Sequence, residues 1–169
     1  FNNDFEVNDF FKIPEPLIQK QFSRIMSLKD GTKKMSKSDL SDQSRINLTD
    51  TEDQIVSKIK KAKTDNLPMP SDVNELDNRN EIKNLIGIYS SLTNSNLEKS
   101  LKDFSGNNFS DFKENLSQAL VDKICPISNE IKKLLSEKTF LDNILNDGFE
   151  KADKIASKKV KKIHEIIGF

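Results

Sequence analysis

"RIMSLKDGTKKMSKSDL", residues 24–40, joins a short apolar run to a cluster of lysines and hydroxyl residues. The alternation in residues 24–28 predicts a short strand, and Asp30-Gly31 predicts a turn directly after it. Residues 33–38, which we call the lysine–serine loop, are too basic for a core and too mixed for a simple basic tail. We therefore expect this loop to lie on the surface and to meet an anionic ligand.

Two interpretations of the lysine–serine loop compete. Lysine-rich loops are most often plain solvated surface. Phosphate binding would use the same groups, because Lys34 and Lys37 carry ammonium charges three residues apart while Ser36 and Ser38 add hydroxyl donors. The chain has neither a G-x-x-x-x-G-K-[ST] loop nor a glycine-rich dinucleotide fingerprint. From the residues alone, a polyphosphate contact on a mobile loop and a solvated stretch both stay open.

Composition narrows the possible functions. The 169 residues contain 27 basic and 27 acidic side chains, so net charge alone provides no attraction to nucleic acid or membrane. One cysteine, Cys125, excludes an internal disulfide, and one histidine, His164, excludes a multi-histidine metal site. No apolar run approaches a membrane span and no signal peptide is visible, so we expect a soluble cytoplasmic protein. The opening "FNNDFEV" looks like mid-chain sequence, and we expect further sequence upstream of Phe1.

The pattern along the chain predicts a mainly α protein. Residues 1–50 carry strand candidates at 24–28 and 45–50, which is typical of the edge of an α/β domain. From residue 51 to 169 the apolar spacing is helical, and Thr51 with Gln54 forms a capping box. Helices are predicted near 81–92, from a second capping box at Ser95 and Glu98 to near Gly106, and from 110 onward with a kink or break at Pro126. Further helices are predicted from a cap at Thr139 to a stop at Gly148, and then to Gly168. Short connections favour an antiparallel bundle.

The string "KMSKS", residues 34–38, is identical to the signature loop of class I aminoacyl-tRNA synthetases. The segments "PEPLI", "RIMSL", "KKMSKSD", "INLTD", "NLIGIYS" and "ILNDGFEKADKIA" follow in the order and spacing found in bacterial-type tryptophanyl-tRNA synthetases. The resemblance covers nearly the whole chain. It departs at Gly31, where that family commonly has proline, and in the variable residues 64–80.

The resemblance implies an enzyme that activates tryptophan with ATP to tryptophanyl-adenylate and transfers tryptophan to tRNA(Trp). It also implies a homodimer in which a Rossmann-type catalytic domain is followed by a helical domain. Residues 1–50 would be the edge of the catalytic domain and carry the KMSKS loop, and residues 51–169 would form the helical domain. Lys34 and Lys37 would lie on the ATP phosphates, and the backbone of Ile25 and Met35 near adenine. Ser36 and Ser38 complete the expected ATP-binding residues, and Mg²⁺ would accompany ATP.

The same resemblance implies a partial active site. The family's histidine- and glycine-containing motif and its tryptophan pocket would lie upstream of Phe1, so we expect this C-terminal portion to be inactive alone. Two other functions stay open: a non-catalytic helical RNA-binding module, and the related tyrosyl-tRNA synthetase.

Two further basic runs and the phenylalanines add expectations. Lys58 and Lys61 share one face of the helix that contains residues 57–63. We interpret that face mainly as solvated, and a contact with tRNA phosphate stays open as the alternative. The run at 154–166 lies where the family's helical domain approaches the anticodon arm, so we predict tRNA contacts there by Lys158, Lys159 and Lys162. The phenylalanines at helical spacing or helix ends are predicted to lie in the core: Phe104, Phe109, Phe112, Phe140 and Phe149.

Overall fold

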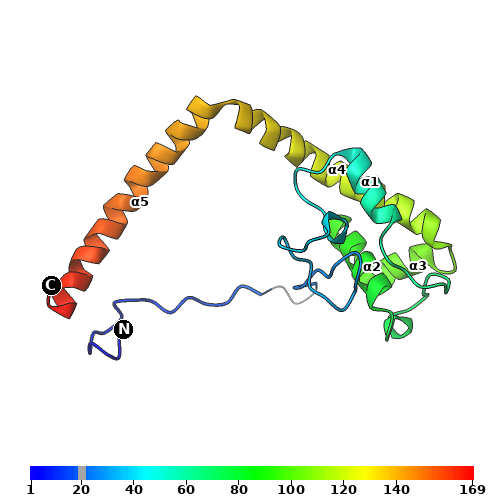
Figure 1. Ribbon diagram of the computed structural model, residues 1–169. Helices are drawn as coiled ribbons and strands as arrows, with labels where there is room; N and C mark the ends of the chain where they lie inside the picture. The colour runs from blue at the N-terminus through cyan, green and yellow to red at the C-terminus, as the bar shows by residue number, and fades with distance from the viewer. Residues whose placement is uncertain (19–21) are drawn as a thin grey trace. The chain divides into compact units, whose positions relative to one another are not determined.

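The computed structural model describes residues 1–18 and 22–169 (Figure 1). The chain forms two compact units, one made of residues 19–132 and the other of residues 1–18 with 133–169. We call them the core unit and the terminal unit. Helices dominate the described residues, so the predicted mainly α class is confirmed. The predicted division at residue 50 does not coincide with these units and stays a prediction.

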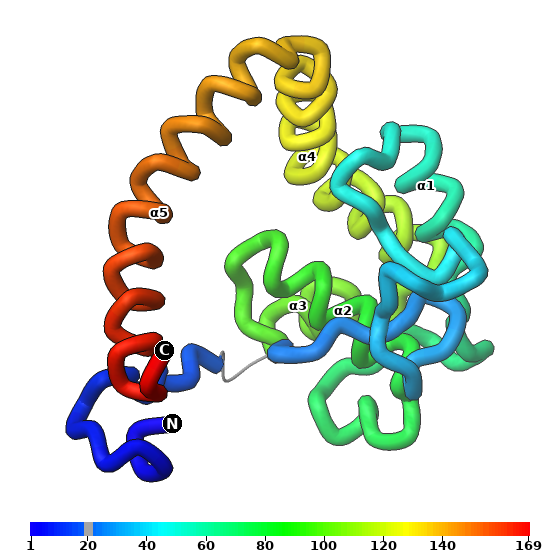
Figure 2. The backbone as a smooth tube through the Cα atoms, turned by 60° about the vertical axis from the view of Figure 1, so that its left-hand side comes forward, coloured from blue at the N-terminus to red at the C-terminus, as the bar shows by residue number. Residues whose placement is uncertain are grey.

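The core unit carries two short 3₁₀ turns, η1 (Asp42–Ser44) and η2 (Asn74–Leu76), and helices α1 (Glu52–Lys60), α2 (Asn80–Leu92) and α3 (Leu97–Phe104). Helix α4 (Phe109–Ser136) begins in this unit. Helices α2 and α3 lie against each other, as Figures 1 and 2 both show. The capping box at Thr51 is confirmed: Thr51 N donates to Gln54 Oε1 at 2.8 Å and Gln54 N to Thr51 Oγ1 at 3.4 Å. The predicted cap at Ser95 is wrong, because Asn96 caps α3 and its Oδ1 accepts from Lys99 N at 2.7 Å.

The core of this unit is apolar and closely packed. Phe104 lies edge-on to both Tyr89 and Phe112, at ring-centroid separations of 5.0 and 5.1 Å. Full burial of one such side chain contributes roughly 1.5–3 kcal/mol to stability. Besides these rings, the most deeply buried apolar residues, each at most 1% exposed, are Leu76, Ile55, Ile59, Ile82, Leu85, Ile86, Leu101 and Leu116.

The two predicted strands are wrong as regular strands. Within the described residues the pairing is a single antiparallel bridge between Met26 and Lys34. Residues 45–50 form a turn in which Asp50 N donates to Asn47 O at 3.1 Å. Neither segment has the continuous row of backbone partners that a β ladder requires.

The terminal unit contains helix α5 (Lys138–Ile167), which ends at Gly168 with φ of 86°. The predicted stop at Gly148 is wrong, because α5 continues through it; an internal glycine costs only about 1 kcal/mol relative to alanine. Helix α4 likewise passes through Pro126 without breaking. Phe140 and Phe149 are exposed, so the prediction that they are core is also wrong. No helix in the described ranges is both long and apolar enough for a membrane span.

Candidate functional site

The lysine–serine loop is one arm of a narrow hairpin. Ser27 N donates to Lys33 O at 2.8 Å, and Met35 N donates to Ile25 O at 3.0 Å. The backbone atoms of Ile25 and Met35, which the sequence predicts beside adenine, are therefore brought into direct contact. Met35 is half-buried against the core cluster, which fixes this end of the loop to the core unit.

The two predicted phosphate lysines point outward from this hairpin. Lys34 and Lys37 are exposed, and within residues 1–18 and 22–169 neither has an ion-pair partner. Ser38 N donates to Ser36 Oγ at 3.3 Å, and the two hydroxyl oxygens lie 3.1 Å apart. Asp39 N donates to Ser36 O at 3.3 Å and closes the turn. The arrangement presents two uncompensated ammonium groups beside two hydroxyls, which suits a polyanion.

Helix α2 holds the hairpin before the loop. The Asn84 amide, which is nearly buried, accepts from Met26 N and donates to Met26 O, both at 2.8 Å. Asn84 thereby pairs with the backbone as a neighbouring strand would. Gly31 lies against the first turn of α2, where a Cβ would come within 2.6 Å of the Asn80 carbonyl carbon. The absence of a side chain at Gly31 therefore permits the close backbone approach.

An ion pair reinforces the same contact. Lys63 Nζ lies 2.8 Å from Glu81 Oε1. The hydrogen bond and charge of Lys63 lower the pKa of Glu81, helped by a bond from the Gly31 backbone. The same pair raises the pKa of Lys63. Glu81 thus joins α2 both to the segment that follows α1 and to the turn that precedes the loop.

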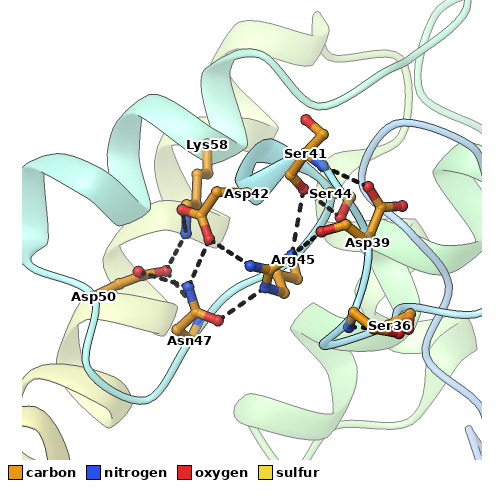
Figure 3. A network of polar contacts seen from close by, with 10 residues as sticks. Ser36, Asp39, Ser41, Asp42, Ser44, Arg45, Asn47, Asp50 and Lys58 are labelled. Atoms are coloured by element: carbon orange, nitrogen blue, oxygen red, sulfur yellow. Dashed lines mark hydrogen bonds and ion pairs between the residues drawn. The ribbon is translucent and has the colours of Figure 1, made fainter.

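The segment after the loop is held by a different set of charges, drawn in Figure 3. Arg45 donates to Asp39 O and pairs with Asp42, each at 3.0 Å. Lys58 contacts both Asp42 and Asp50 at 2.7 Å. The prediction that Lys58 lies on a solvated face is wrong, because its side chain is 2% exposed. The hydrogen bond from Lys58, followed by that from Asn47, lowers the pKa of Asp42.

The predicted tRNA-contact lysines all lie on α5. Lys158 and Lys162 are exposed one helical turn apart. Lys159 is half-buried: its ammonium donates to Phe10 O and lies 3.7 Å from the centroid of the Phe10 ring. Lys159 therefore has a partner within the terminal unit, whereas Lys158 and Lys162 have no ion-pair partner among the described residues.

A cavity of about 720 Å³ lies apart from the loop, between α1 and α4. Lys113 borders it and donates to Lys60 O and Ala62 O at 3.2 and 2.7 Å, which satisfies carbonyls at the end of α1. Burial lowers the pKa of Lys113. In the described residues, no cluster of three or more His, Cys, Asp and Glu side chains is arranged to hold a metal ion.

Comparison with known proteins gives consistent matches. The family model "tRNA synthetases class I (W and Y)" matches residues 1–125. The chain is 46% identical over 166 residues to the tryptophan--tRNA ligase of Brucella melitensis, covering 98% of this chain and 47% of that protein. It is 48% identical over 166 residues to the tryptophan--tRNA ligase of Agrobacterium fabrum, again covering 98% and 47%. The chain therefore spans about half the length of these relatives.

Solved structures agree with the sequence matches. The tryptophanyl-tRNA synthetase of Mycoplasma pneumoniae superposes with a TM-score of 0.80 at 25% identity, covering 99% of this chain and 49% of that one. The Campylobacter jejuni enzyme, solved in complex with ADP and tryptophan, gives a TM-score of 0.69 at 25% identity, covering 99% and 50%. With its loop, its fold and its matched residues in agreement, the chain belongs to the class I tRNA synthetases of the tryptophan and tyrosine group.

Proposed function

We propose that this chain is the C-terminal part of a tryptophan--tRNA ligase, in which Lys34 and Lys37 stabilise the phosphates of ATP. The observation that carries the proposal is a pair of exposed lysines, without an ion-pair partner among the described residues, on a hairpin that also joins Ile25 to Met35. The relatives at 46% and 48% identity bear the name tryptophan--tRNA ligase, which favours tryptophan over tyrosine as the substrate.

The chemistry requires little beyond positioning and charge. A carboxylate oxygen of tryptophan attacks the α-phosphorus of ATP, a new P–O bond forms, and the bond to the pyrophosphate oxygen breaks. Negative charge grows on the departing pyrophosphate. Ammonium groups held near that charge stabilise the transition state more than the ground state. Lys34 and Lys37 supply these groups, Ser36 and Ser38 add hydroxyl donors, and the joined backbone of Ile25 and Met35 borders adenine.

Further partners follow from the same proposal. Mg²⁺ enters as the counter-ion of the ATP phosphates; this loop contributes lysines to that site and no carboxylate ligand. tRNA(Trp) contacts the lysines of α5, and the tryptophan pocket is formed by sequence upstream of Phe1. The working protein is a cytoplasmic homodimer.

The decisive experiment is exchange of pyrophosphate into ATP by the full-length protein, measured with each amino acid separately. Exchange that depends on tryptophan is expected. Exchange that depends on tyrosine would instead assign the tyrosine relative, and no exchange with any amino acid would favour a non-catalytic RNA-binding module. The 169-residue chain alone is expected to show no exchange above background, because it lacks the proposed tryptophan pocket; clear exchange would refute the partial site.

A further inference from the structure

Lys58 has an unusual environment for a lysine. It lies in the last turn of α1, and its side chain is 2% exposed. A buried ammonium is tolerated only where carboxylates or other acceptors compensate its lost hydration. Two carboxylate oxygens do so here, from Asp42 and Asp50, each 2.7 Å from Nζ (Figure 3).

The two carboxylates have different positions in the chain. Asp50 is 5% exposed and directly precedes the N-cap of α1, so it is local to the helix that carries Lys58. Asp42 is 53% exposed and lies in η1, on the segment that leaves the lysine–serine loop. Because Asp50 already neutralises Lys58, the contact with Asp42 is additional to the needs of the helix.

A chain of contacts continues from Asp42 to the loop. Asp42 accepts from Asn47 Nδ2 at 3.0 Å and pairs with Arg45 at 3.0 Å. Arg45 in turn donates to Asp39 O at 3.0 Å. Asp39 directly follows Ser38, so this chain of contacts reaches from buried Lys58 to within two residues of Lys37.

The charges in this network balance. Lys58 and Arg45 carry two positive charges, and Asp42 and Asp50 carry two negative charges. A balanced, hydrogen-bonded set holds its members in a fixed geometry more strongly than an isolated pair does. The hairpin bonds hold the loop on its N-terminal side, and this network holds it on its C-terminal side.

We infer that Lys58, acting through Asp42 and Arg45, is a positioning residue that fixes the end of the lysine–serine loop so that Lys37 meets the pyrophosphate oxygens. The inference rests on the proposed function, because it assigns a support to the same loop. Lys58 touches no substrate in this scheme. Its effect reaches the reaction only through the placement of Lys37.

The test uses the full-length protein and single-turnover adenylate formation with tryptophan and ATP. Asp42→Ala removes the connection but leaves the Lys58–Asp50 pair, so we expect the variant to fold. We expect adenylate formation to fall by roughly tenfold to a hundredfold, the size of loss that follows a displacement of about 1 Å. Tryptophan affinity should stay unchanged, and Asp42→Asn, which keeps one acceptor oxygen, should recover part of the rate.

The matched control is Asp53→Ala, which removes an exposed carboxylate from the first turn of α1. Its adenylate rate should equal that of the wild type. Lys58→Met should show a loss in adenylate rate at least as large as that of Asp42→Ala. Its melting temperature is measured as well, to show that the variant is folded in the assay. An Asp42→Ala rate equal to that of Asp53→Ala would overturn the inference.

A double-mutant cycle separates positioning from a general structural effect. In a Lys37→Ala background, Asp42→Ala should cost less than twofold more, because the group that it positions is already absent. Full additivity of the two losses would overturn the inference. If Lys37→Ala itself leaves adenylate formation intact, the proposed function fails; if it is damaging while Asp42→Ala is neutral, only the positioning role fails.

Discussion

At the scale of single residues, the lysine–serine loop exposes positive charge that its own chain does not neutralise. Lys33 pairs with Asp30 at 3.5 Å, whereas Lys34 and Lys37 have no such partner among the described residues. An ammonium without an ion-pair partner has no intramolecular contact to give up when an anionic ligand arrives, whereas a lysine engaged in a surface ion pair does. Lys34 and Lys37 are therefore available to bind an anionic ligand.

Lys37→Ala in the full-length protein should therefore damage adenylate formation far more than tryptophan binding. Removal of one donor that stabilises growing charge in the transition state typically costs about 3–4 kcal/mol, or roughly a hundredfold to a thousandfold in rate. Lys37→Arg should recover only part, since a planar guanidinium does not replace a compact ammonium. The measurement is the single-turnover rate of adenylate formation in each variant, compared with its separately determined affinity for tryptophan.

Lys29 provides the control for that prediction. It precedes the turn and is exposed, and its Nζ lies 3.5 Å from Ser41 Oγ. Lys29→Ala should be mild. Equal and mild effects of Lys29→Ala and Lys37→Ala would reduce the lysine–serine loop to a solvated basic stretch.

The burial of Lys58 and its acidic partners could not be predicted from residue types alone. Residue types alone placed Lys58 with its lysine neighbours on a solvated face. Its position repeats the buried spacing of α1, because Ile55, Lys58, Ile59 and Ala62 follow the i, i+3, i+4, i+7 pattern. The acids that make burial possible lie 8 and 16 residues upstream, in segments without periodicity. A charged residue on an apolar stripe was the available signal, but its partners became visible only in three dimensions.

At the scale of elements, α2 takes the place of a neighbouring strand beside the hairpin. Asn84→Ala would leave the N–H and C=O of Met26 without their partner. Orphaned groups of this kind cost about 1–3 kcal/mol each, so denaturant unfolding of the full-length protein should show a loss of roughly 2–6 kcal/mol. ATP affinity should fall as well, because Ile25 is adjacent to Met26.

Asn80→Ala is the matched change for this prediction. Asn80 is the first residue of the same helix, and its side chain is exposed. Its substitution should alter stability by no more than about 0.5 kcal/mol. If the two variants were equally stable, the Asn84 bonds to Met26 would contribute nothing to the folded state.

The Glu81–Lys63 pair between α2 and the end of α1 predicts a pH dependence. The pKa of Glu81 lies below its ordinary 4.5 in the folded chain, so the unfolded chain takes up the proton first as pH falls. The stabilising contribution is therefore complete above about pH 4.5 and is lost as pH falls through the lowered folded pKa. Lys63 behaves oppositely, with loss only above its ordinary 10.5.

Melting temperatures of the wild type and of Glu81→Gln test this dependence between pH 7 and 3. The difference between the two proteins should stay constant down to about pH 4.5 and shrink below it. Glu98→Gln, an exposed carboxylate in the first turn of α3, should show no comparable change across that range. A wild-type advantage that persisted undiminished to pH 3 would contradict the role of the Glu81 charge.

Element types were predictable where local signals agreed. Thr51 and Gln54 specify a cap through their own hydrogen bonds, and the spacing of Ile82, Leu85 and Ile86 specifies the buried face of α2. The predicted helix end at Gly148 was wrong because a glycine marks a helix end only where the backbone adopts the left-handed conformation, as it does at Gly168. The strand at 24–28 failed because one of its neighbours is the side chain of Asn84, which no strand pattern reveals.

At the scale of the whole molecule, the exposed lysines of α5, Lys158 and Lys162, are predicted to contact tRNA. Lys158→Glu with Lys162→Glu in the full-length protein should weaken tRNA binding and spare amino acid activation. Each lost phosphate contact should lower the slope of log affinity against log salt by roughly 0.7–0.9. Lys159 is left intact in this variant because its ammonium is bound to Phe10.

Lys99→Glu with Lys102→Glu is the charge-matched control, since both lysines are exposed on α3. Its tRNA affinity should change little after the equal shift in net charge. The same affinity and salt slope in both double variants would assign Lys158 and Lys162 to plain solvated surface.

The bonds between Asn84 and Met26 have a consequence for the timing of synthesis. The two residues are 58 positions apart, and the lysine–serine loop lies between them. A ribosome that adds about 5–20 residues per second needs roughly 3–12 s to travel that distance. During this interval the loop has emerged without the helix that anchors it, and its exposed lysines can meet the anionic ribosomal RNA and the cell's nucleotides. The lysine–serine loop therefore gains its support from α2 only several seconds after its own residues have been made.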